Sequence, residues 1–332
     1  MTPSKQERPE ERGAALLSVL LLVAVMAVIA GVMLDRLNLA ARLAGNGQAM
    51  TQARLYATSG ETIALSRLKA LVDLDRSRTV DSRNLLGRDF PLPLARGSVT
   101  MRIEDAGNCF NLNSLVEGET GHYTLRPAAL EQMRALMRLL QVDEGAAIRI
   151  SDATADWIDS DSAPAPNGAE DPYYSSLPVP YRTAGHLIGD VSEVRAVKDM
   201  TPAIYARLRP WLCALPTTDL SPINLNTLRP EQARLLTMLS PTVFPLDRVR
   251  ALIAQRPAEG YASPDDFTRA FRGGSEGSII APIGQLQVTS RWFTLDITSR
   301  VDSIELSESA LVDVSLTPAR VAFRSWGDPA DR

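Results

Sequence analysis

The sequence predicts an α+β fold in which one long N-terminal helix lies on an antiparallel sheet, and a large all-α domain is inserted into that sheet. Three observations predict it. An apolar segment near the N-terminus continues into an amphipathic one, strand-like alternation occurs near residue 100 and again only beyond residue 290, and an Asn-x-Asn motif occurs twice between them. A helix followed by strands is typical of a sheet with a helix covering one face.

The N-terminal segment is long enough to cross a membrane. Residues 14–34 contain no charged side chain, and Ser18 is their only polar one. At about 1.5 Å per residue, such a helix covers the ~30 Å hydrocarbon core of a bilayer. Lys5, Arg8 and Arg12 precede it, so the N-terminus is expected to stay cytoplasmic. A cleavable secretory signal and a plain signal anchor are the alternative interpretations.

The helix is expected to continue beyond the membrane segment. Apolar side chains recur every three or four positions over residues 35–74, which predicts an apolar stripe on one face. Gly45 and Gly47 are expected to weaken or kink it. Residues 76–93 carry no regular pattern and predict a loop.

Four segments carry the alternation of a half-buried strand. The first covers residues 99–103, and the others cover 293–297, 312–316 and 321–323. Because the first segment lies far from its expected partners, the residues between them are predicted to form an inserted domain.

The insertion contains an internal repeat. Cys-Phe-Asn-Leu-Asn-Ser-Leu at residues 109–115 recurs as Ile-Asn-Leu-Asn-Thr-Leu at 223–228. An Arg-Pro pair then opens a helix in each copy, and the Asn-Ser and Asn-Thr pairs are expected to supply helix N-caps. Each copy ends in an acid-capped helix, at 190–194 and at 263–267. The repeat predicts two related helical units of helix-hairpin-helix or SAM-like type.

An acidic loop lies between the two copies, and residues 150–181 contain no lysine or arginine. Hard cations such as calcium bind six to eight oxygens from carboxylates, amides and backbone carbonyls. The loop therefore predicts a structural calcium site, and a solvated loop with capping aspartates is the alternative. The predicted ligands are Asp156, Asp159, Asp161, Glu170 and Asp171.

The chain has two cysteines, Cys109 and Cys213, one before each Asn-x-Asn motif. In an oxidising compartment a single disulfide between them is expected, and two buried free thiols are the alternative. Closing a loop of that length contributes on the order of 4 kcal/mol in the chain-entropy treatment.

Nucleic-acid binding and catalysis are both disfavoured. The net charge is -4. Helix-hairpin-helix modules hold DNA through a glycine-bearing hairpin, but the corresponding turn at 240–245 has two prolines and no glycine. Gly-x-Ser-x-Gly at 273–277 has the spacing of a nucleophile elbow, yet no strand precedes it and no histidine follows Ser275. We expect no catalytic residue, no small-molecule cofactor and no nucleic-acid partner.

The N-terminus resembles type IV prepilins and pseudopilins. Gly13 stands between the basic leader and the apolar segment, which implies that a prepilin peptidase cuts after it and methylates Ala14. Most such subunits carry a glutamate at the fifth mature position, where this chain has Ser18. A carboxylate within a membrane costs roughly 2.5 to 3.5 kcal/mol unless it finds a partner. A tip subunit has no subunit ahead of it to supply that partner, so it is expected to carry a residue such as Ser18 in place of the glutamate. The alternative explanation is that Ser18 is only a tolerated small residue.

The chain resembles the K-type minor pseudopilins of type II secretion systems over essentially its whole length. The resemblance is carried by Ser18, the Asp-Trp-Ile-Asp-x-Asp segment and the Asn-x-Asn pair. The resemblance implies a non-enzymatic inner-membrane subunit with a periplasmic domain. It also implies a position beside the I- and J-type minor pseudopilins at the pseudopilus tip, and calcium in the acidic loop. A membrane-anchored DNA-binding protein of an uptake system is the alternative.

The expected organisation has six parts. They are a leader (1–13), a transmembrane helix (14–34), the first part of a pilin-like domain (35–108), a helical unit with the acidic loop (109–216), a second helical unit (217–285) and the remainder of the pilin-like domain (286–332).

Overall fold

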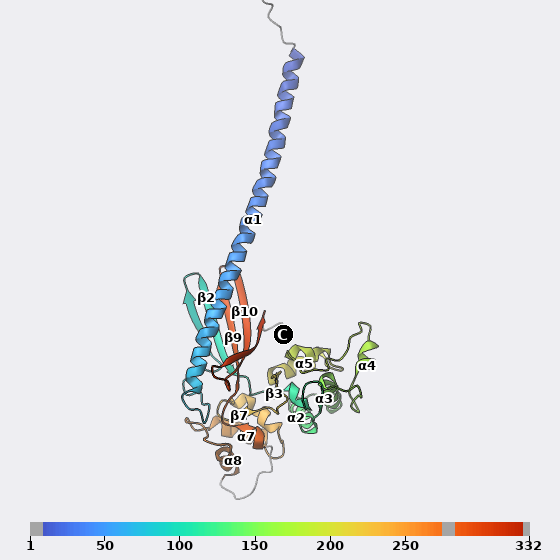
Figure 1. Ribbon diagram of the computed structural model, residues 1–332, viewed down its shortest axis with the longest axis vertical. Coiled ribbons are helices and arrows are strands. Elements are labelled where there is room, and N and C mark those ends of the chain that lie inside the picture. Colours follow the sequence, from blue (N-terminus) through green and yellow to red (C-terminus); the bar gives the residue numbers. More distant parts are fainter. Residues whose placement is uncertain (1–8, 274–282, 328–332) are drawn as a thin grey trace, which may run out of the picture.

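The computed structural model describes residues 9–273 and 283–327 and contains a helix far longer than the rest of the molecule (Figure 1). This helix, α1 (Pro9–Val72), is continuous. Residues 16–48 are exposed, and the globular part of the molecule covers only the C-terminal portion of the helix. The expected kink at Gly45 and Gly47 is wrong, because a helical glycine costs only about 1 kcal/mol, too little to interrupt a long helix.

The sheet has five antiparallel strands in the order β1-β2-β9-β10-β11. The strands are β1 (Asp89–Leu94), β2 (Gly97–Asp105), β9 (Trp292–Val301), β10 (Ile304–Asp313) and β11 (Arg320–Trp326). The predicted pairing of the segment near residue 100 with the C-terminal strands is confirmed by the β2–β9 register.

Two strand predictions need correction. The loop predicted at 76–93 contains most of β1, whose Pro91 and Pro93 hide its alternation but are tolerated at the edge of a sheet. The strand predicted at 312–316 belongs to β10, which runs from Ile304 to Asp313. Its first half is largely polar, so its alternation is weak in the sequence.

Helix α1 packs on β2, β9 and β10 through small residues (Figure 1). Ala57 and Ala64 are buried against the sheet, and a Cβ added to Gly60 would lie 2.8 Å from Cγ1 of Val99. These small residues therefore let the helix approach the sheet closely. The core between them also contains Leu68, Met101, Ile103, Phe293, Leu295 and Ile297.

The inserted residues form two helical units with one continuous hydrophobic core. The first contains β3 (Phe110–Asn111), η1 (Leu112–Leu115), β4 (Val116–Glu117), β5 (Thr124–Leu125), α2 (Pro127–Leu139), α3 (Glu144–Ile158), α4 (Asp171–Ser175), η2 (Val191–Ala196), α5 (Pro202–Leu208), η3 (Arg209–Trp211) and β6 (Leu212–Cys213). The second contains β7 (Ile223–Asn224), η4 (Pro230–Ala233), α6 (Arg234–Thr237), α7 (Leu246–Ala254), α8 (Pro264–Arg272), η5 (Ile283–Gln285) and β8 (Leu286–Gln287).

The units share a plan in which a strand at the start pairs in parallel with a strand at the end. In the first unit β3 pairs with β6, and in the second β7 pairs with β8. The predicted acid-capped helices are present, since Asp190 and Ser263 each form a capping box at η2 and α8. The first unit does not end at η2 as expected, because α5 and η3 follow it. The internal repeat inferred from the sequence is therefore also a structural repeat.

Asn113 and Asn226 do not cap α2 and η4, the helices that follow the Arg-Pro pairs, so that expectation is wrong, although Asn111 caps the short η1. The N-cap of α2 is Arg126, which makes no side-chain capping bond. Instead, Asn113 Oδ1 accepts from the Ile188 amide at 2.7 Å, and its Nδ2 donates to the Ile188 carbonyl at 2.9 Å. Asn226 binds Tyr261 in the same way, at 2.7 and 3.0 Å. Each buried amide side chain thus joins the start of its unit to the segment before its acid-capped helix, η2 in the first unit and α8 in the second.

Candidate metal centre and disulfide

The shared asparagine contacts show where the acidic loop belongs in the unit. In the second unit, only a short turn separates the end of α7 from Tyr261. In the first unit, the corresponding stretch from the end of α3 to Ile188 contains the whole acidic loop and α4. The loop is therefore an extension at one turn of a repeated helical scaffold.

Three of the five predicted ligands come together at this loop. Asp156 lies in the last turn of α3, Asp159 is its C-cap, and Glu170 is the N-cap of α4. One carboxylate oxygen from each lies within 4.8 Å of the others. The three residues are only 1, 4 and 3% exposed, respectively. Three carboxylates are thus held together almost without solvent.

The protein provides hydrogen-bond partners for only some of the carboxylate oxygens in this cluster. Asp156 accepts hydrogen bonds from the amides of Ala165 at 3.1 Å and Ala169 at 2.8 Å. Among the described residues, Asp159 Oδ1 and Glu170 Oε1 are buried with no hydrogen-bond partner. Buried polar atoms are normally paired, so two such oxygens beside a third carboxylate indicate a site for a proton or a cation.

The electrostatics agree with the geometry. Burial, followed by repulsion from neighbouring carboxylates, raises the pKa of Asp159 to about 8. The same causes raise the pKa of Glu170 to about 7. Burial raises the pKa of Asp156 to about 6, although the two amides that it accepts from oppose the shift. The cluster therefore resists carrying three negative charges unless a positive charge joins it.

The other predicted ligands lie outside this cluster. Asp161 is exposed, and its Oδ1 accepts from the Ala163 amide at 2.7 Å. Asp171 Oδ1 accepts from the Thr183 amide at 2.9 Å. Asp152, one turn before Asp156, forms an ion pair with Arg134 of α2 instead. Proximity in sequence thus suggested more ligands than the fold assembles.

Two supporting residues carried no sequence signal. A Cβ added to Gly168 would lie 1.8 Å from Asp156 Oδ2, so only glycine fits there. Lys198 Nζ donates to the Gly168 carbonyl at 3.0 Å and lies 5.0 Å from the centre of the Tyr173 ring. Lys198 is distant in sequence from the loop, and nothing in the local pattern connects the two.

The donor set fits a hard divalent cation. All three converging groups are carboxylates, which calcium and magnesium prefer, and the set includes no sulfur or imidazole donor. A cation would use the two buried oxygens that have no partner and would offset the charge of the cluster.

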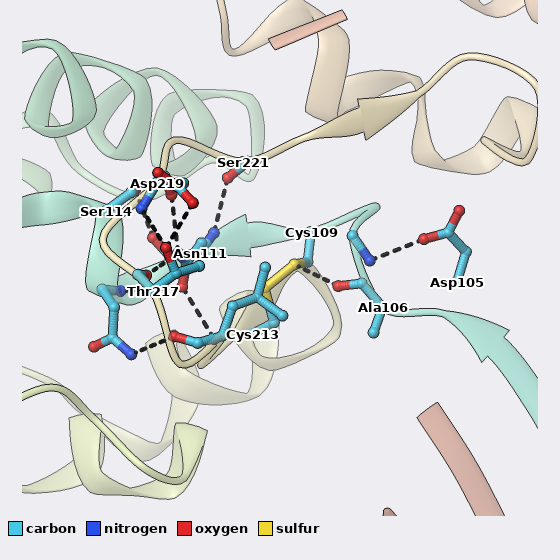
Figure 2. Close-up of a disulfide and its surroundings, with 12 residues drawn as sticks. Asp105, Ala106, Cys109, Asn111, Ser114, Cys213, Thr217, Asp219 and Ser221 are labelled. Atoms are coloured by element: carbon cyan, nitrogen blue, oxygen red, sulfur yellow. Dashed lines mark hydrogen bonds between the residues drawn. A yellow bond between two sulfur atoms is a disulfide. The ribbon is translucent and has the colours of Figure 1, made fainter. Parts of the chain in front are cut away.

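Cys109 and Cys213 form a disulfide (Figure 2). Their Cα atoms are 5.8 Å apart, and the residues are separated by 104 positions in sequence. Asn111 pairs with Cys213 in the short parallel β3–β6 ladder beside it, and Asn111 Nδ2 donates to the carbonyls of Thr217 and Asp219 at 2.9 and 3.0 Å. The bond therefore joins the start of the first unit to its end.

A cleft of about 1040 Å³ lies where the pilin-like and helical parts meet. It is lined by the end of α1, residues 215–222 and the β10–β11 connection, and it does not include the carboxylate cluster. The Gly-x-Ser-x-Gly segment cannot be placed, because residues 274–277 lie outside the described ranges.

A long, partly uncovered N-terminal helix packed on an antiparallel sheet defines a pilin-like protein, here with a duplicated helical insertion (Figure 1). Family models for type II secretion system protein K match residues 108–217 and 223–289. The chain belongs to the type II secretion system protein K family.

Individual relatives agree with this assignment. The chain is 33% identical to the type II secretion system protein K of Pectobacterium carotovorum, over 96% of this chain and 98% of that one. It is 38% identical to the Aeromonas hydrophila protein K, over 77% and 79% of the two chains. In the crystal structure of the GspK-GspI-GspJ complex from enterotoxigenic Escherichia coli, a matching chain has a TM-score of 0.74 at 30% identity, covering 85% of this chain and 98% of that one. None of these comparisons favours the DNA-uptake alternative.

Proposed function

We propose that this protein is a non-enzymatic minor pseudopilin that sits at the pseudopilus tip with I- and J-type minor pseudopilins and initiates pseudopilus assembly for protein export. The solved relative is one component of a GspK-GspI-GspJ complex, which supports the same partners here. The proposal includes an inner-membrane anchor, a periplasmic globular domain, and cleavage by a prepilin peptidase.

The position of the helical units carries the proposal. The second unit lies at the end of the globular part farthest from the exposed portion of α1, and the first unit projects sideways from that end of the sheet (Figure 1). In a filament of parallel helices, this bulk would occupy the space of the next subunit towards the tip. A subunit of this shape is therefore best accommodated where no subunit follows.

The N-terminal sequence supports the same position. Helix α1 includes an apolar window with a mean hydropathy of 2.9 that is not covered by the rest of the molecule, as a single membrane span requires. Ser18 places no carboxylate in that window, so insertion does not depend on a neighbour that neutralises one. Gly13 and Ala14 lie in α1 at the proposed cleavage point.

Mass spectrometry of the membrane-extracted protein tests the proposal. We expect a mature chain that begins at methylated Ala14 and copurifies with its I- and J-type partners. Gly13→Leu should leave the leader attached and abolish secretion. Gly31→Leu is the matched control, because a Cβ at Gly31 meets nothing within 4 Å and the change keeps the segment apolar. Full secretion by an uncleaved Gly13→Leu protein would contradict the proposal.

The carboxylate cluster is proposed to hold a structural calcium ion. Asp156, Asp159 and Glu170 would bind it, and calcium tolerates irregular sets of oxygen ligands better than magnesium does. When bound, the ion supplies the positive charge that the cluster lacks. The protein residues fix the loop between α3 and α4 around it, and Lys198 and Gly168 hold the loop from outside.

A further inference from the structure

Arginine and aromatic side chains alternate across the two helical units. The guanidinium carbon of Arg195 of η2 lies 5.7 Å from the centre of the Tyr205 ring of α5. Arg209 follows one helical turn after Tyr205, because its amide donates to the Tyr205 carbonyl. Trp211 of η3 then contacts Arg234 of α6, whose guanidinium carbon is 5.4 Å from the centre of the Trp211 ring. We call these five residues the arginine band.

The positive charges of the arginine band are not compensated. In the described part of the chain, none of its three arginines forms an ion pair or a side-chain hydrogen bond, and two of their Nε atoms are buried without a partner. The acids nearest in sequence are engaged elsewhere, since Glu193 accepts from amides in its capping box and Asp199 pairs with another arginine. Glu231 is exposed and forms no ion pair with Arg234, three positions later. The band is therefore a local excess of positive charge on a chain whose net charge is -4.

The residue types in the arginine band fit a protein partner. Arginine, tryptophan and tyrosine are enriched at the centres of protein interfaces and supply most of their binding energy. The ring contacts already hold two of the guanidiniums in place, so less side-chain entropy is lost on binding. Three cations on a negatively charged chain would neutralise too few phosphates to hold a nucleic acid at physiological salt. Charge complementarity therefore favours an acidic protein surface.

The location of α5 indicates where that protein approaches. Along the long axis of the molecule, α5 lies nearer to the exposed portion of α1 than α2 and α3 do (Figure 1). The first unit projects sideways from the sheet, so a second pilin-like subunit packed along α1 would meet the α5 side of this projection. The arginine band begins on that side, at η2 and α5.

We propose that the arginine band docks an acidic surface of the adjoining I- or J-type minor pseudopilin, a role that rests on the proposed function. Carboxylates of the neighbour would accept paired N–H···O bonds from the guanidiniums, which favour such bidentate geometry. Tyr205 and Trp211 would add apolar contact area beside these bonds and exclude water from them. The inserted helical units thereby fix the neighbour as well as occupying the tip.

Binding of the full chain, in detergent micelles, to the copurified I- and J-type pair tests this surface by biolayer interferometry. The wild type should bind, more weakly at about 500 mM salt than at about 50 mM, because salt screens the charges. Arg234→Ala should weaken binding about 30-fold, the loss typical of a central interface arginine. Arg195→Glu, at an exposed position that does not disturb folding, should weaken binding at least about 10-fold and flatten the salt dependence.

Arg250→Glu is the matched control, because it changes the net charge equally at an exposed arginine of α7 that already pairs with Asp247. It should keep the wild-type affinity. The proposal is overturned if Arg195→Glu and Arg234→Ala bind the pair as tightly as the wild type, or if Arg250→Glu loses as much.

Parallel measurements with duplex DNA and with phosphatidylglycerol vesicles separate the other possible ligands. Binding of either one that is lost on Arg195→Glu, with binding of the pair unchanged, would assign the arginine band to that ligand and overturn the proposal. A wild-type chain that does not bind the pair at all would contradict the proposed function itself, and the docking surface with it.

Discussion

Calcium should stabilise the helical insertion, and Asp159→Asn should remove that effect. Asp159 lies at the junction of α3 and the acidic loop, and its Oδ1 is buried without a partner. In calcium-free protein above about pH 8, where Asp159 is ionised, the three carboxylates repel one another. The substitution removes one of these charges and retains an oxygen at the same place. We therefore expect Asp159→Asn to raise the melting temperature without calcium and to lose most of the increase that calcium produces.

The repulsion that Asp159→Asn removes follows from the distance between the carboxylate oxygens. Two unit charges 4.8 Å apart, the outer limit for these oxygens, repel by about 3.5 kcal/mol at an effective dielectric constant of about 20. Calcium at 100 times its dissociation constant contributes about 2.7 kcal/mol to the free energy of unfolding. For a domain of roughly 150 to 250 residues, 1 kcal/mol shifts the melting temperature by about 2 to 4 °C. We expect an increase of about 5 to 10 °C in the wild type.

Differential scanning calorimetry of the full chain in micelles, with calcium or with a chelator, measures this shift. Asp161→Asn is the matched control, since Asp161 is exposed, accepts from a local amide and should leave the increase intact. Terbium luminescence excited through Trp157, which adjoins Asp156 in α3, reports binding independently. A wild-type melting temperature that is the same in calcium and chelator, with no terbium signal, would refute the reasoning.

Two further predictions concern the scaffold that carries the loop. Replacing both Cys109 and Cys213 by serine should lower the free energy of unfolding by about 4 kcal/mol, because the disulfide closes a loop of 104 positions. Urea unfolding with and without reductant measures this contribution. Equal unfolding midpoints would exclude a stabilising disulfide. Asn226→Ala should lower the free energy of unfolding by about 2 to 3 kcal/mol, because it leaves the buried amide and carbonyl of Tyr261 without their partner. As a control, Gln255→Ala at an exposed position should lower it by less than about 0.5 kcal/mol in the same assay.

The sequence was most informative where a pattern is long or repeated. The apolar window of α1 and the two Asn-x-Asn motifs predicted the membrane-length helix and the duplicated insertion, since both follow from local regularity. The sequence was least informative where tertiary contacts determine which residues form a strand or which partners a side chain binds. Pro91 and Pro93 concealed an edge strand, and the polar first half of β10 concealed the start of that strand. The partners of Asn113 and Asn226 lie many residues away, so local reasoning assigned them to capping.

The same distinction applies to the carboxylate cluster. The density of acids in residues 150–181 located the candidate site, but it could not separate Asp159 from Asp161. They differ because Asp159 is the C-cap of α3 and points into the interior, whereas Asp161 lies two residues later on the exposed loop. The oxygens of Asp152 are likewise engaged by Arg134 of another helix and by Asn167 of the loop. Such choices depend on where a helix ends and on what packs beside it.

Comparing the two helical units explains why one of them would need a cation. In the second unit the turn before Tyr261 is short, and it is fixed by Gly260 at φ +74° packed against Asn226. The first unit extends the same turn into a long loop, whose backbone such a contact cannot hold. Ordering a longer segment costs conformational entropy, about 1 to 2 kcal/mol per residue. A cation bound by Asp156, Asp159 and Glu170 would join the end of α3 to the start of α4 within the extension, and so fix by coordination part of what the second unit achieves with a tight turn.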